Sequence, residues 1–198
     1  MAYTYGLFVY ENAASLDFIG PSDVFGISGY LMKKGRVMTV AQSPGSIHCF
    51  GGLEIVPQET IDTSPPLDVL VVPGTGDPDA IHAIGDQALN WIRAQADQAK
   101  FITAVCTGAL ILQKTGLLRQ RKATTHWMHL ETLSQDPTIT VLPEMRYVRD
   151  GNLVTSQGVS AGIDMALWLV GQLHSPDHAR QVRKILQYDP APPYTAEV

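Results

Sequence analysis

The segment FITAVCTGALILQKTG, residues 101–116, contains the most informative transition in the sequence. Phe101–Val105 is short, apolar and partly β-branched, which is typical of a buried strand. Gly108–Lys114 then has the apolar spacing of a helix, and Gly116 is a residue type that commonly ends helices. The sequence therefore predicts a strand that turns sharply into a helix, with Cys106 in the turn.

A cysteine in such a turn lies beside the free backbone N–H groups that begin the helix. Those donors and the helix dipole favour a negative charge, so we predict a lowered pKa for Cys106. The arrangement is that of a nucleophile elbow with sulfur in place of a hydroxyl. The alternative is a cysteine that only fills space, because free cysteine is among the most buried residue types.

The composition excludes several classes of function. The chain has 198 residues, of which 45% are hydrophobic and 17% charged, and its formal net charge is −5. These values fit one globular domain over residues 1–198 and give no sign of a nucleic-acid or membrane partner. No apolar run reaches the roughly 18 residues of a membrane span. Cys49 and Cys106 are too few for a disulfide framework and are typical of a protein of the reducing cytoplasm.

Strand-like and helix-like segments alternate along the chain. This order favours an α/β fold with a largely parallel sheet and right-handed crossovers. Ser15 is expected to cap the first helix, and Gly20-Pro21 is expected to kink or restart it. The expected strands are residues 3–10, 36–41, 67–72, 101–105, 122–125, 138–142, 145–148 and 153–156, with a further hairpin at 47–56, and the expected helices are residues 15–25, 87–98, 108–114, 160–173 and 176–186.

Candidate functional residues follow four of the predicted strands. They are Asp17, Gly74-Thr75, Cys106-Thr107 and His126. Ligands bind beyond the carboxyl ends of the strands in open parallel sheets, so we expect these residues to meet at one edge of the sheet. Each signal has a simpler explanation by itself: an acid in a first helical turn complements the dipole, and His126 can be a packed residue at a strand end.

Six motifs together resemble the ThiJ/PfpI superfamily, and within it the isonitrile hydratases. The superfamily comprises flavodoxin-like α/β proteins with helices on both faces of the sheet and a reactive cysteine at an elbow. The amidase-like half of many transcription regulators shares most of the motifs. The motifs span nearly the whole chain: LDFIGP at 16–21, PPLDVLVVPG at 65–74, VCTGAL at 105–110, ATTHW at 123–127, VRDGNL at 148–153 and AGIDMAL at 161–167.

The resemblance implies a role for each candidate residue. Cys106 would be the nucleophile, Asp17 its acid/base partner and Thr107 a supporting donor. The backbone at Gly74 and Thr75 would line the substrate site. His126 could reach that site too, although a structural role is equally open. The resemblance also implies a homodimer, and the chemistry it implies needs no cofactor or metal.

Two positions depart from family patterns. Thr75 stands where the family usually has a second glycine, and threonine tolerates positive φ less well, which puts the shape of that turn in question. Thr107 stands where proteases of the superfamily have histidine, which argues against proteolysis.

The activity implied is hydration of isonitriles to N-substituted formamides through a thioimidate on Cys106. The expected scheme has Asp17 protonated while Cys106 is ionised. One alternative is a cofactor-independent glyoxalase or glycation-repair enzyme, although these favour Glu at the position of Asp17. Another is a redox-sensing or chaperone-like dimer in which Cys106 is oxidised without turnover.

Overall fold

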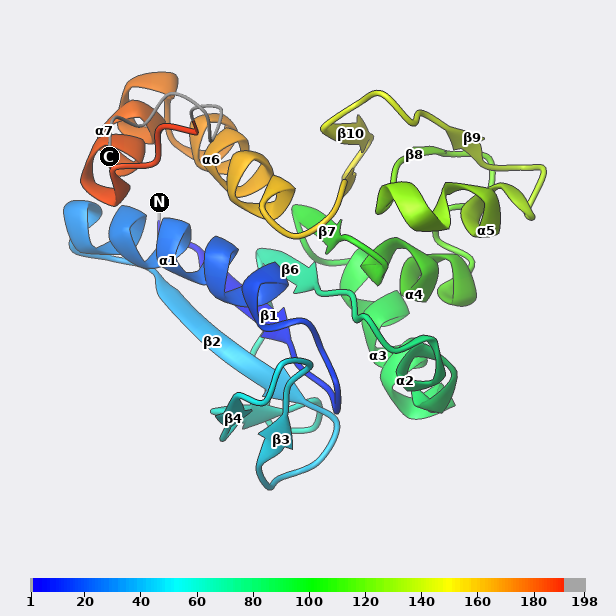
Figure 1. Ribbon diagram of the computed structural model, residues 1–198. Helices are drawn as coiled ribbons and strands as arrows, with labels where there is room; N and C mark the ends of the chain where they lie inside the picture. The colour runs from blue at the N-terminus through cyan, green and yellow to red at the C-terminus, as the bar shows by residue number, and fades with distance from the viewer. Residues whose placement is uncertain (1, 191–198) are drawn as a thin grey trace, which may run out of the picture.

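A seven-stranded sheet lies at the centre of residues 2–190, the part of the chain that the computed structural model describes (Figure 1). Neighbouring strands are parallel except for the first two in the spatial order. That order is β10 (Tyr147–Asp150), β11 (Leu153–Ser156), β7 (Phe101–Val105), β6 (Val69–Val72), β1 (Thr4–Phe8), β2 (Arg36–Ala41) and β5 (Glu59–Thr60).

Helices cover the sheet on both faces. On one face, α1 (Ser15–Met32) packs with α6 (Ala161–Leu173) and α7 (Pro176–Leu186), which are far from it in sequence but adjacent in space (Figure 1). On the other face lie α3 (Asp86–Ala96) and α4 (Gly108–Thr115). Every residue of β6 and β7 is buried, as expected of parallel strands covered on both sides. The predicted flavodoxin-like α/β architecture is confirmed.

Both predicted hairpins form. The first joins β3 (Ile47–His48) to β4 (Glu54–Ile55) in antiparallel register. The second joins β10 to β11, and Gly151 between them has a φ of 63°, a left-handed conformation that glycine adopts without strain.

The first helix is longer and more regular than predicted. It runs through Gly20-Pro21 without interruption, and its N-cap is Ala14, so Ser15 is not the cap. A Cβ atom on Gly20 would lie 2.9 Å from Cγ1 of Ile163 in α6. The small residue thus allows close approach of α1 and α6, and this packing outweighs the hydrogen bond that Pro21 cannot make.

The segment before His126 does not join the central sheet. Strand β8 (Lys122–Ala123) pairs instead with β9 (Thr140–Val141) in a separate two-stranded ribbon. Thr124 connects this segment to the sheet differently, because its N–H donates to Oγ1 of Thr155 at 2.8 Å. The predicted short strand at 122–125 therefore forms only at Lys122–Ala123, and it lies outside the central sheet. The sequence of so short a strand does not indicate which strand it pairs with.

Three short helical segments were not predicted. They are α2 (Pro78–Ala83), η1 (Trp127–His129) and α5 (Leu130–Ser134). Each has fewer than two turns, too few for a hydrophobic period to be recognised. Within residues 2–190, no helix combines the length and apolarity needed to cross a membrane.

A buried polar contact joins α1 to α7. Oγ of Ser28 and Nε2 of His178 are 2.8 Å apart, and both side chains are buried. The ring of His174 lies 5.0 Å from that of His178 between centroids. Burial lowers the pKa of both histidines, and the charge of His178 lowers the pKa of His174 further.

These histidines predict a loss of stability in mild acid. Because their pKa values are lower in the folded state, the unfolded chain binds protons more readily below about pH 6.5. The midpoint temperature of thermal unfolding should stay constant from pH 8 to about pH 6.5 and should fall between there and pH 5.5. His178→Gln should reduce the fall, whereas His82→Gln, at an exposed histidine, should not. Equal slopes in all three proteins would contradict this assignment.

Candidate active site

Cys106 lies in a strained turn between β7 and α4. Its φ is 60°, a conformation that residues other than glycine rarely adopt. Two hydrogen bonds hold the turn: Oγ1 of Thr125 donates to the carbonyl of Cys106 at 2.8 Å, and the Cys106 N–H donates to the carbonyl of Gln157 at 3.2 Å. The sharp strand-to-helix turn predicted from the sequence is present, with the geometry of a nucleophile elbow.

Glycines bring the turn after β6 against this elbow. A Cβ on Gly108 would overlap the carbonyl oxygen of Val72, and a Cβ on Gly74 would overlap Oγ1 of Thr107. Neither Gly74 nor Thr75 has a positive φ, so Gly74 is required for close approach rather than for its conformation. Thr75 is therefore compatible with this turn.

Thr107 joins the two turns through its hydroxyl. Its Oγ1 accepts a hydrogen bond from the Thr75 N–H at 2.8 Å and donates to the Thr75 carbonyl at 2.9 Å. The backbone N–H and the hydroxyl of Thr107 also interact with the sulfur of Cys106. The single hydrogen of the Thr107 hydroxyl is donated to the Thr75 carbonyl.

Asp17 lies beneath the elbow, inaccessible to solvent. Its Oδ2 accepts a hydrogen bond from the Gly74 N–H at 2.9 Å, while Oδ1 has no hydrogen-bond partner among the described residues. Burial raises the pKa of Asp17 to about 6, and the Gly74 N–H and the Cys106 side chain partly offset the rise. Asp17 and Cys106 are thus neighbours in the interior.

The pKa of Cys106 moves opposite to the prediction. Burial and then the charge of Asp17 raise it to about 12. Backbone donors do oppose the rise, as expected at a helix start, but they do not outweigh it. The two acids form a coupled pair. The raised pKa of Cys106 favours the thiol over the expected thiolate, with Asp17 as the carboxylate that faces it.

Val159 belongs to the site but was not predicted. Its backbone N–H acts as a donor to the sulfur of Cys106. Its φ is 50°, which is unfavourable for a β-branched residue. No sequence pattern marks such a position, because valine is a poor candidate for a left-handed turn.

A cavity of about 380 Å³ lies over the elbow. The predicted residues Cys106, Thr107, Thr75 and His126 are on its wall, whereas Asp17 and Gly74 lie behind the wall. The predicted residues therefore meet at the carboxyl edge of the sheet, four of them on the cavity wall and two behind it. In residues 2–190 there is no group of three or more His, Cys, Asp or Glu side chains suited to a metal ion.

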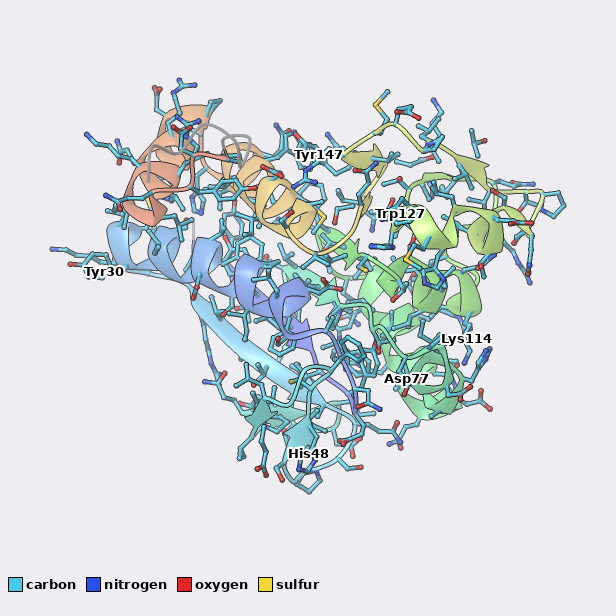
Figure 2. All side chains as sticks on the ribbon, in the orientation of Figure 1. Tyr30, His48, Asp77, Lys114, Trp127 and Tyr147 are labelled. Atoms are coloured by element: carbon cyan, nitrogen blue, oxygen red, sulfur yellow. The ribbon has the colours of Figure 1, made fainter. Side chains whose placement is uncertain are left out.

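A backbone hydrogen bond defines the tautomer of the neutral His126 ring. Its Nδ1 accepts a hydrogen bond from the Met128 N–H at 3.3 Å, so the neutral ring carries its hydrogen on Nε2. Burial, and then the nearby His129, lower its pKa and favour the neutral form. Its neighbour Trp127, labelled in Figure 2, is 71% exposed.

The buried carboxyl predicts a pH-dependent cost to stability. Asp17 has a folded pKa of about 6 against an ordinary value of 3.8 for an aspartate side chain, so the folded state loses stability as pH rises between these values. Asp17→Asn should remove that loss and be more stable above pH 7 by roughly 2–3 kcal/mol. Urea unfolding at pH 4, 5, 6 and 7.5 measures the difference. A constant difference between the two proteins at all four pH values would contradict the assignment.

Comparisons with known proteins place the chain in a family. An isonitrile hydratase of Pseudomonas putida is 38% identical over 199 residues, covering 98% of this chain and 82% of that protein. The crystal structure of a THiJ/PfpI family protein from Pseudomonas syringae superposes with a TM-score of 0.88 at 34% identity, covering 100% of this chain and 80% of the other.

A more distant relative is a transcriptional regulator. The HTH-type transcriptional regulator GbdR of Pseudomonas aeruginosa is 29% identical over 139 residues, which are 70% of this chain and 37% of the regulator. The profile of the DJ-1/PfpI family matches residues 6–172, and the chain therefore belongs to the DJ-1/PfpI family.

Proposed function

We propose that this protein hydrates isonitriles to N-substituted formamides, with Cys106 as nucleophile and Asp17 as its acid/base partner. The observation that carries the proposal is the buried Asp17 carboxyl beside the Cys106 thiol, below a cavity open to small molecules. The likeness to an isonitrile hydratase over nearly the whole chain supports the same reaction.

The first step adds the S–H bond of Cys106 across the terminal carbon of R–N≡C. The Asp17 carboxylate takes the thiol proton as sulfur bonds to carbon, and then gives that proton to the same carbon. The product is the thioimidate R–N=CH–S–Cys106. The N–H groups of Thr107 and Val159 stabilise the sulfur while it carries negative charge.

The second step hydrolyses the thioimidate. Asp17 takes a proton from water as the hydroxyl bonds to carbon, and passes it to nitrogen. The C–S bond then breaks, the hydroxyl proton returns to sulfur through Asp17, and R–NH–CHO leaves. The Nε2–H of neutral His126 on the cavity wall orients the water.

The remaining predicted residues support this pair. Gly74 holds Asp17 through its N–H, while Thr75 and Thr107 fix the turn that faces the substrate. Both cysteines are unpaired, and the reaction needs a free thiol, so we infer that the enzyme acts in a reducing compartment such as the cytoplasm. The homodimer stays a prediction from the family resemblance.

Substitution of either partner should remove hydration. With an aryl isonitrile as substrate, Cys106→Ala should form formamide only at the uncatalysed rate, and Asp17→Asn should lower kcat/KM by about 10²–10⁴-fold. Chromatography of the formamide gives the rate, and circular dichroism verifies folding. Undiminished turnover in either variant would rule out the mechanism.

Parallel incubation with methylglyoxal separates the alternatives. Lactate in place of formamide would identify a glyoxalase, and oxidation of Cys106 without turnover of either compound would identify a redox sensor.

The mechanism also predicts how activity depends on pH. Because Asp17 must be a carboxylate to accept the thiol proton, kcat/KM should fall as pH decreases through about 6. An alkyl isonitrile, which does not titrate in this range, is a suitable substrate. The residual activity of Asp17→Asn should lack this step. A wild-type profile that is flat from pH 5 to 8 would contradict the role of Asp17 as base.

A further inference from the structure

Four large apolar side chains surround the mouth of the cavity over Cys106. We call Leu16, Phe50, Met128 and Val159 the apolar collar. They are 43%, 51%, 64% and 39% exposed, respectively. All four line the same cavity, yet they come from four separate segments: α1, the β3–β4 hairpin, η1 and the turn before α6. Four exposed apolar side chains thus gather at the entrance to the candidate site.

The cavity wall lacks formal charge. It contains no Asp, Glu, Lys or Arg, and its ionisable side chains are Cys106, His126 and His129. The Asp17 carboxylate lies behind the elbow, where its charge raises the pKa of Cys106. A negatively charged substituent would lose its hydration on entering, gain no cationic partner and be repelled by Asp17.

Phe50 is held in the collar by contacts of both its backbone and its ring. Its N–H donates to the carbonyl of Ala13 at 2.9 Å, and Phe50 forms a β-bridge with Ala14. Its ring lies against Gly76, where an added Cβ would meet the ring at 2.5 Å. The β3–β4 hairpin, which carries the labelled His48 in Figure 2, is therefore attached next to the start of α1, at Ala14, three residues before Asp17.

We propose that the apolar collar binds the organic group of the substrate and restricts the enzyme to neutral isonitriles with an alkyl or aryl group. Phe50 and Met128 are the specificity-determining residues. This inference rests on the proposed hydration and adds the substrate class to it. The volume of about 380 Å³ is within the range of small-molecule sites, so the cavity holds an organic group as well as the reacting carbon.

A homologous series of n-alkyl isonitriles, from ethyl to hexyl, tests the proposal. Each methylene that enters an apolar site should raise kcat/KM about fourfold, until the cavity is filled. Methyl 4-isocyanobenzoate and 4-isocyanobenzoate form a matched pair, and the charged member should be the poorer substrate by at least about tenfold.

Variants of the apolar collar provide a second test of the proposal. Phe50→Ala and Met128→Ala should flatten the dependence of kcat/KM on chain length, because they remove the apolar surface that the longer chains contact. Val56→Ala is the control, because Val56 is 75% exposed, follows β4 in the same hairpin and is not on the cavity wall. It should retain the wild-type dependence.

Three results would overturn the proposal: a flat dependence in the wild type, a dependence that both collar variants retain, or a preference for the carboxylate. The other partner that fits such an apolar surface is a second copy of this chain. Light scattering on the same variants detects it. If Phe50→Ala dissociates an oligomer without changing the chain-length dependence, the collar binds a second copy and the proposal is wrong. Absence of formamide from every isonitrile would instead refute the proposed hydration.

Discussion

The site depends on one interaction, between a carboxyl and a thiol that are both withdrawn from water. Burial raises the pKa of Asp17 to about 6 and that of Cys106 to about 12, and the charge of Asp17 contributes to the rise at sulfur. An isolated cysteine at such a depth would be inert. Beside a carboxylate with a raised pKa, its proton has an acceptor of useful basicity within the same buried space.

Close backbone packing makes this pairing possible. The turn after β6 lies directly against the elbow after β7, because Gly74 and Gly108 have no side chains to separate the strands' ends. The Gly74 N–H then reaches Asp17, and the hydroxyl of Thr107 reaches Thr75. Three strand-to-helix connections are thereby joined at one point, and the rest of the sheet acts as the frame that keeps them in register.

The same region contains backbone strain. Cys106 and Val159 both have positive φ, which costs of order 1–3 kcal/mol at each such position. Both strained residues direct groups at the same atom: one places the sulfur and the other aims an N–H at it. Hydrogen bonds from Thr125 and to Gln157 hold the elbow in this conformation. Two of the six non-glycine residues with positive φ in the described part of the chain thus lie where the proposed chemistry occurs.

Local patterns in the sequence determined the α/β alternation, the elbow at Cys106 and the positions of Asp17, Thr75 and Thr107 near one edge of the sheet, because strand and helix periods and turn residues are local properties. Tertiary structure alone decided the direction of the Cys106 pKa shift, the unbroken course of α1 through Pro21, the separate ribbon of β8 and the participation of Val159 and Phe50. Burial, close approach and backbone strain arise between segments distant in sequence, so no local pattern encodes their balance.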